Sequence, residues 1–385
     1  MQDESARRIP FNRPYLTGQE IDYLLEAHAS GVLAGDGVFT KRCNEWLERS
    51  TGTAKALLTH SCTAALEMGA LLFDIQPGDE IIMPSYTFVS TANAFVLRGG
   101  VPVFIDIRPD TLNLDETLIE AAITSRTRAI VPVHYAGVGC EMDAIMAIAS
   151  RRRLDVLEDA AQGAMATYRG RALGSIGTLG ALSFHETKNV ISGEGGALLV
   201  NDQRLVGRAE VIREKGTNRA RYYRGEVDKY TWEDVGSSFL PGEIVAAFLW
   251  AQLQRAREIT NARLALWTKY HDSFADLETR EVIRRPVVPA GCGHNAHMYY
   301  LLLARHIDRR MVLQRLHEQG VHPVFHYVPL HSSPAGKKFS RSYGTLQITD
   351  DVAQRIIRLP MWVGMTSTDQ DRVVSQIIES IIDAK

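Results

Sequence analysis

Short apolar segments alternate with helix-like patterns between residues 55 and 201, and this alternation restricts the fold more than any other feature. Apolar runs of this length, separated from one another by helices, are typical of strands that are buried on both faces of a mostly parallel sheet. We therefore expect an α/β fold whose large domain contains a mostly parallel seven-stranded sheet. The segments are 55–60, 80–84, 101–106, 129–134, 154–159, 180–185 and 196–201.

The pattern changes beyond about residue 242. Residues 243–273 contain few helix breakers and predict one or two long helices between two domains. Farther on, strand-like pieces at 298–303 and 321–327 mix with helical patterns at 310–319 and 369–382, which is typical of an α+β domain. We expect a large domain over 1–255, N-terminal arm included, and a smaller α+β domain over 256–385.

Composition excludes several classes of protein. Hydrophobic residues make up 45% of the 385 residues and charged residues 23%, which are ordinary globular values, and the net charge of −2 argues against a protein that binds nucleic acid through a basic field. The N-terminus lacks an apolar core and no apolar run is long enough to span a membrane, so we expect a cytoplasmic protein. Four cysteines without CxxC spacing indicate reduced thiols and no metal site: Cys43, Cys62, Cys140 and Cys292.

Lys188 and Asp159 carry the strongest chemical signal. Lys188 follows the strand-like segment 180–185 and precedes a glycine-rich turn at 192–196, where backbone can approach a ligand closely. Such a lysine can form a Schiff base with an aldehyde cofactor, and a carboxylate at the end of a nearby strand can hold a pyridinium nitrogen protonated. Together they predict pyridoxal 5′-phosphate (PLP). The competing interpretations are a surface lysine, and an aspartate that pairs with an arginine or caps a helix.

Other polar residues follow the predicted strands. In parallel sheets ligands bind at the carboxyl ends of the strands, and Asp106, His134 and Ser183 lie at or just past such ends. Ser61 and Thr63 follow the first strand and open a helix, where free N–H groups bind phosphate, although such residues are usually helix N-caps. Phe88 is positioned to stack on a flat ring or to lie in the core, and Gln162 to reach a cofactor oxygen or to be solvated. His134, Tyr135, His185, Tyr299, His326 and His331 are further titratable groups without a distinctive spacing.

These strand-end residues match a known family. The chain resembles the nucleotide-sugar aminotransferases of the DegT/DnrJ/StrS family, which have PLP fold type I, along nearly its whole length. The matching segments are 84–88 (PSYTF), 104–107 (FIDI), 131–137 (VPVHYAG), 158–162 (EDAAQ), 183–188 (SFHETK), 193–196 (GEGG) and 327–331 (YVPLH).

The resemblance implies a role for each candidate residue at the cofactor. Lys188 would hold PLP covalently and move a proton between cofactor and substrate, while Asp159 would pair with the pyridinium nitrogen. Gln162 would approach the ring oxygen, and Phe88 would stack on the ring. The phosphate would be held by Thr63, the Ala64 backbone N–H and Ser183.

The resemblance also implies a homodimer with active sites shared between subunits. Many members carry Asn-Tyr-Arg where this chain has Ser238, Phe239 and Leu240, so Ser238 takes the place of an asparagine that reaches the neighbouring subunit's cofactor phosphate. Lys229 and Tyr230 lie in a basic, aromatic loop that either contacts the substrate's pyrophosphate or base, or is a solvated surface loop. Further substrate contacts are expected from Tyr327 and His331.

The run 184–189 (FHETKN), together with 35–37 (GDG) and 236–240 (GSSFL), is most similar to members that aminate C4 of dTDP-4-keto-6-deoxyglucose, with L-glutamate as donor. The alternative is another nucleotide-sugar aminotransferase with a C3-keto, UDP-linked or GDP-linked substrate. A sugar dehydratase of this family would carry histidine in place of Lys188, and an ordinary amino-acid transaminase would show an arginine for a second carboxylate, which no motif locates. A non-catalytic regulatory protein on the same fold is a further alternative, against which the retention of Lys188, Asp159, Gln162 and Ser183 argues.

Overall fold

The computed structural model describes residues 8–382, and its centre is a mostly parallel sheet. The expected α/β fold is therefore confirmed, with an eighth strand of two residues added at one edge. β9 runs antiparallel to both of its neighbours, and the other paired strands are parallel. In order across the sheet, the strands are β1 (Lys55–Thr59), β9 (Gly196–Val200), β8 (Leu179–Ser183), β5 (Asp155–Asp159), β4 (Thr127–Ile130), β2 (Glu80–Pro84), β3 (Val101–Ile105) and β13 (Arg341–Ser342).

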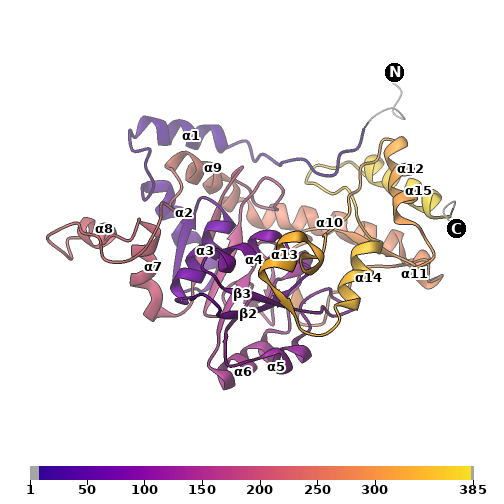
Figure 1. The fold of residues 1–385 in the computed structure, drawn as a ribbon. Helices are drawn as coiled ribbons and strands as arrows, with labels where there is room; N and C mark the ends of the chain where they lie inside the picture. The colour runs from indigo at the N-terminus through magenta and orange to yellow at the C-terminus, as the bar shows by residue number, and fades with distance from the viewer. Residues whose placement is uncertain (1–7, 383–385) are drawn as a thin grey trace.

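Helices cover both faces of this sheet (Figure 1). Alternate strand residues point to opposite faces, so Leu57 and Leu58 of β1 belong to different apolar clusters. One cluster contains residues of α2 (Val38–Thr51), α6 (Met142–Arg152) and α9 (Glu243–Gln254). The other contains residues of α3 (Cys62–Leu72), α4 (Val89–Val96) and α7 (Val206–Arg213). Burial on both faces explains why the strands are continuously apolar in sequence.

The C-terminal part forms a second layer of structure around a small antiparallel sheet in the order β10 (Ile283–Arg284), β12 (Tyr300–Leu303) and β14 (Ile356–Arg358). The helical stretch expected at 243–273 is two helices, α9 and α10 (Ala256–Ser273), with Arg255 between them. The other two predicted helices are confirmed as α12 (Arg309–Glu318) and α15 (Ser367–Ile382), which pack against each other. The division into domains at residue 255 stays a prediction.

One predicted strand is wrong. Residues 321–327 form no strand but make isolated bridges, from Val321 to Ile9 and from Val324 to Arg358. Pro323 lies between the two bridges and has no N–H to donate to a ladder, so continuous pairing is interrupted there.

The remaining elements are short or peripheral. Two of them matter below: α8 (Arg219–Tyr223), which projects from the body of the molecule, and α14 (Gln347–Arg355) (Figure 1). Within residues 8–382, no helix combines the length and the apolar character needed to cross a bilayer. The remaining α-helices and strands are α1 (Glu20–Ala29), α5 (Ile119–Ala122), α11 (Ala275–Thr279), α13 (Pro334–Phe339), β6 (Thr167–Tyr168), β7 (Arg171–Ala172) and β11 (Cys292–Gly293).

Candidate active site

A cavity of about 570 Å³ opens at the carboxyl ends of β5 and β8. The sequence segments that line it come from the start of α3, the loop before α4, the turn after β8 and the C-terminal part of the chain. Seven of the predicted site residues share this cavity: Thr63, Phe88, Asp159, Gln162, Ser183, Lys188 and Tyr327.

Lys188 lies on the turn that follows β8. Its backbone N–H donates to the His185 carbonyl at 2.9 Å, which fixes the turn. No residue in the described part of the chain accepts a hydrogen bond from its side-chain amine or forms an ion pair with it. Burial lowers the pKa of this amine, and the Arg358 charge adds to that, whereas Cys62 and Asp159 act in the opposite direction. Lys188 is therefore neutral in a larger fraction of molecules at a given pH than an exposed lysine is, as a nucleophile or base requires.

Asp159 is a buried carboxylate at the end of β5. Its Oδ2 accepts a hydrogen bond from Thr91 Oγ1 at 2.7 Å, and its Oδ1 accepts one from the Ala161 N–H at 3.1 Å. Among residues 8–382, no cationic side chain forms an ion pair with it. A buried carboxylate is costly without a cation. A pyridinium N–H would supply that missing cationic partner, so the burial of Asp159 and Lys188 fits PLP.

Gln162 and Phe88 lie on the walls of the cavity. Gln162 Oε1 accepts from the Ala136 N–H at 2.7 Å, and its Nε2 donates to the Tyr327 hydroxyl at 3.1 Å. These two bonds orient the amide at the cavity wall. Phe88 precedes α4 as its N-cap residue and is 58% exposed, so it is not the core aromatic of the competing interpretation.

The predicted phosphate cradle lies at the start of α3. Ser61, Cys62 and Thr63 line the cavity, and Thr63 Oγ1 is 2.7 Å from Ser90 Oγ. The Ala64 N–H, however, donates to Ser61 Oγ at 3.1 Å, so Ser61 acts as the N-cap of the helix. Contact between Ala64 and a phosphate, which stays a prediction, would require the Ser61 side chain to turn away.

Other predicted residues lie outside this cavity. Ser238, Lys229 and Tyr230 are exposed, with the last two on the segment that follows α8. His331 contacts Ser85 Oγ through Nδ1 at 2.8 Å and lies 3.3 Å from a carboxylate oxygen of Asp350.

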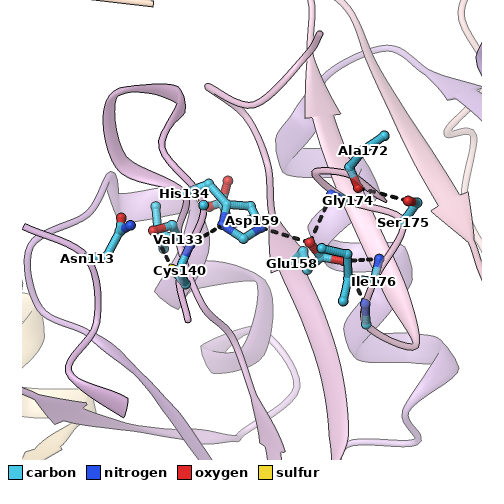
Figure 2. A network of polar contacts seen from close by, with 12 residues as sticks. Asn113, Val133, His134, Cys140, Glu158, Asp159, Ala172, Gly174, Ser175 and Ile176 are labelled. Carbon is cyan, nitrogen blue, oxygen red and sulfur yellow. Dashed lines mark hydrogen bonds and ion pairs between the residues drawn. The ribbon is translucent and has the colours of Figure 1, made fainter. Parts of the chain in front are cut away.

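Two strand-end residues have packing roles. The Asp106 carboxylate accepts hydrogen bonds from the Ile348 and Thr349 N–H groups at the start of α14. His134 is fully buried between Cys140 and Glu158 (Figure 2). Its Nδ1 accepts from the Cys140 N–H at 3.1 Å, so its Nε2 carries the proton that it donates to Glu158 Oε2 at 2.8 Å.

Sequence reasoning missed residues that the fold brings into the cavity. Thr91, His297 and Arg358 line it, and Thr91 bonds directly to Asp159. His297 and Arg358 come from the C-terminal part, more than a hundred residues from Lys188, and no spacing in the sequence relates them to it. For Thr91, the only signal in the sequence was a hydroxyl group a few residues after the strand-like segment 80–84.

Comparisons with known proteins identify the family of the chain. The model of the DegT/DnrJ/EryC1/StrS aminotransferase family matches residues 14–378. The chain belongs to that family. This aminotransferase is 33% identical to the spore coat polysaccharide biosynthesis protein SpsC of Bacillus subtilis over 96% of each chain. It is also 33% identical to GDP-perosamine synthase of Caulobacter vibrioides, over 97% of this chain and 99% of the relative.

Solved structures share the fold. The aminotransferase TlmJ from Streptoalloteichus hindustanus superposes with a TM-score of 0.90 at 27% identity, over 98% of this chain and 100% of that one. The sugar aminotransferase Spr1654 of Streptococcus pneumoniae, solved in PMP and PLP forms, has the same fold at 24% and 23% identity. The protein is accordingly a PLP-dependent sugar aminotransferase.

Proposed function

We propose that this aminotransferase transfers the amino group of L-glutamate to C4 of a dTDP-4-keto-6-deoxyhexose. The products are a dTDP-4-amino-4,6-dideoxy sugar and 2-oxoglutarate. The proposal rests on the resemblance of the run 184–189, together with 35–37 and 236–240, to dTDP-4-amino-4,6-dideoxygalactose transaminases.

The last two of these segments lie against each other. A Cβ at Gly35 would come within 2.4 Å of Leu240 Cγ, so only glycine fits there. The next residue, Asp36, pairs with the buried Arg213 at 2.6 Å. Two segments separated by two hundred residues therefore pack against each other.

PLP, when bound, supplies an aldehyde that accepts the donor's amino group and a ring that accepts electrons. In the proposal Lys188 Nζ would hold the cofactor covalently and would serve as the base that carries the proton. Asp159 would pair with the ring nitrogen, and Thr91 and the Ala161 N–H hold that carboxylate in place. Phe88, on the cavity wall, would lie against the ring.

The proposed enzyme is a cytoplasmic homodimer with shared active sites. Ser238 is exposed and its backbone is held by a bridge to Glu214, which leaves its hydroxyl accessible to a neighbouring subunit. Tyr230, 52% exposed, and Lys229 lie on the same projecting part of the chain. We assign these residues, with Tyr327 and His331, to the cofactor phosphate and the substrate.

A second candidate substrate is a GDP-linked keto sugar. The 33% identity to GDP-perosamine synthase over nearly the whole chain favours it. The two substrates differ in the nucleotide, which is attached at C1, across the hexose ring from C4.

An absorbance titration distinguishes the two candidate substrates and tests the amino donor. The PLP-loaded enzyme is given L-glutamate and then dTDP-4-keto-6-deoxyglucose or GDP-4-keto-6-deoxymannose, while the band of bound PLP is followed. Loss of the band with L-glutamate and its return with the dTDP sugar is the expected result. If the band returns only with the GDP sugar, the substrate is GDP-linked and not dTDP-linked. If L-glutamate does not remove the band, the assignment of the donor is overturned.

A further inference from the structure

Arg358 is the cavity residue to which the proposed function gives no role. It is the last residue of β14, and its backbone is fixed on both sides. Its N–H donates to the Val324 carbonyl at 2.7 Å, and its carbonyl accepts from the Val324 N–H at 3.1 Å. From this fixed position the side chain lines the same cavity as Lys188.

The Arg358 guanidinium has no anionic partner in the described part of the chain. Its Nε is buried and has no hydrogen-bond partner, and its Cζ lies 4.7 Å from the centre of the Phe11 ring. Stacking on an aromatic ring orients a guanidinium but leaves its N–H groups unpaired. A cation removed from water without an anion is unfavourable, so the arrangement favours an anionic ligand.

The charges around Arg358 do not supply that anion. Of the described residues that line the cavity, Lys188 and Arg358 are the lysine and arginine, and Asp159 and Glu194 are the acids. Asp159 is held by Thr91 and the Ala161 N–H, and the exposed Glu194 lies 3.6 Å from His185.

The two histidines in the C-terminal wall of the cavity add no charge. Burial lowers the pKa of both His297 and His326, and the charges of Lys188 and Arg358 lower it further. Both imidazoles are therefore neutral near pH 7. The cavity at Arg358 thus carries a positive charge that no neighbouring group neutralises.

We propose that Arg358 binds the α-carboxylate of the amino donor through paired N–H···O bonds and so holds the donor's amine beside Lys188. This inference rests on the proposed function. A planar guanidinium matches a carboxylate in this bidentate way, which a point charge does not.

The α-carboxylate of the donor suits Arg358 better than the two other anions of the reaction do, namely the diphosphate of the nucleotide sugar and the phosphate of the cofactor. The α-carboxylate is attached to the carbon that bears the amine, so it must lie close to the reacting atoms. The diphosphate of a nucleotide sugar is attached at C1, across the hexose ring from C4. The cofactor phosphate is assigned to the start of α3, where the Ser61 and Thr63 hydroxyl groups and the N-terminus of the helix offer it donors.

The test compares Arg358→Gln with the wild type and with Arg284→Gln as a matched control. Arg284 lies on β10 of the same small sheet and also has buried, unpaired Nε and Nη2 atoms, but it does not line the cavity. The rate of the half-reaction with L-glutamate is measured in single turnovers at increasing donor concentration. We expect Arg358→Gln to raise the concentration for half-maximal rate about 10- to 100-fold, as loss of a charge-assisted pair predicts. Arg284→Gln should leave it unchanged.

Two binding measurements provide readouts besides activity. Calorimetry of 2-oxoglutarate with the PLP-loaded enzyme, with which the keto acid cannot transaminate, should show the same loss of affinity in Arg358→Gln, while the PLP concentration for half-saturation stays within about twofold. Arg358→Lys, which keeps the charge and loses the fork, should fall between the wild type and Arg358→Gln. This second variant also keeps the test decisive if Arg358→Gln does not fold.

The outcomes separate this inference from the proposed function. A wild type that does not react with L-glutamate contradicts the proposed donor. A reactive wild type with unchanged donor dependence in Arg358→Gln overturns the role of Arg358 alone. A change confined to keto-sugar dependence, or to PLP affinity, would assign Arg358 to the diphosphate or the cofactor phosphate and also overturn it.

Discussion

Glu158 and Asp159 are consecutive acids at the end of the same strand, and the protein treats them in opposite ways. Glu158 is completely buried and accepts hydrogen bonds from His134 Nε2 at 2.8 Å and from backbone N–H groups of the loop after β7 (Figure 2). Those backbone distances are 2.9 Å to Gly174, 2.5 Å to Ile176 and 2.6 Å to Gly177. Asp159, which points to the other face, accepts from Thr91 and Ala161 and opens on the cavity.

The difference separates a structural carboxylate from a functional one. Donors within the protein surround Glu158, so it has no capacity left for a ligand and ties the 174–177 loop to the sheet. Asp159 has a fixed position but no cation of its own, and that leaves it available to a bound pyridinium. Because side chains alternate along a strand, one step in sequence is enough to move a carboxylate from packing to chemistry. Substitutions on the cavity side should therefore abolish activity without unfolding the protein. A substitution at Glu158 should instead lower stability and change the turnover of the folded molecules much less.

The largest expected effect on the cavity side is at Lys188. Lys188→Ala should lower turnover by about 10³-fold or more, because the covalent anchor and the base are lost together. The absorbance band of bound PLP should disappear, while the midpoint of urea unfolding stays close to that of the cofactor-free wild type, since no described residue bonds to the amine. Lys188→Arg, which keeps a cation, should be equally inactive. Substantial activity in either variant would mean that another group holds the cofactor.

Asp159→Asn tests the functional carboxylate itself. Asparagine keeps an acceptor for the Ala161 N–H and can donate to Thr91, so the fold should persist. Loss of the charge opposite the ring nitrogen should lower turnover about 10²- to 10³-fold, which corresponds to removing one partner of a buried ion pair. Asp155→Asn, at the other end of the same strand and outside the cavity, serves as the matched control. Equal losses in the two variants would contradict the distinction.

Glu158→Gln should reverse the pattern. The amide would place N–H donors where His134 Nε2 and the Gly174 N–H now donate, so two donors would face two donors. We expect a loss of about 3 kcal/mol in the free energy of unfolding, measured by urea denaturation. Turnover per folded molecule should change far less than in Asp159→Asn. Glu120→Gln, which removes a partly exposed acid paired with Arg151 and Arg152, should leave the free energy of unfolding nearly unchanged.

These contrasts also mark how far the sequence could predict the site. Continuous apolar runs located the strands, and residues at their carboxyl ends gave Lys188, Asp159 and Ser183, because parallel strands bring their ends to one edge. The same rule also selected Asp106 and His134, which have packing roles. The rule finds residues at strand ends, but it does not show whether a side chain faces the cavity or the protein interior. Arg358 could not be found, because it reaches the cavity through the packing of the small sheet. The strand expected at 321–327 failed at Pro323, where tertiary bridges replace a ladder.

The smallest expected effect is at Thr91, which sharpens the comparison because it changes only how Asp159 is held. Thr91 Oγ1 donates to Asp159 Oδ2 at 2.7 Å and lies 2.8 Å from Thr87 Oγ1. Thr91→Val keeps the shape of the side chain but removes the donor, so Asp159 retains the bond from Ala161 alone. We expect about a fivefold loss of turnover and about 1 kcal/mol of stability, the worth of one hydrogen bond. Thr91→Ser keeps the hydroxyl and should retain most of the activity. If valine and serine reduce turnover equally, packing at the methyl group, and not the bond to Asp159, accounts for the presence of threonine.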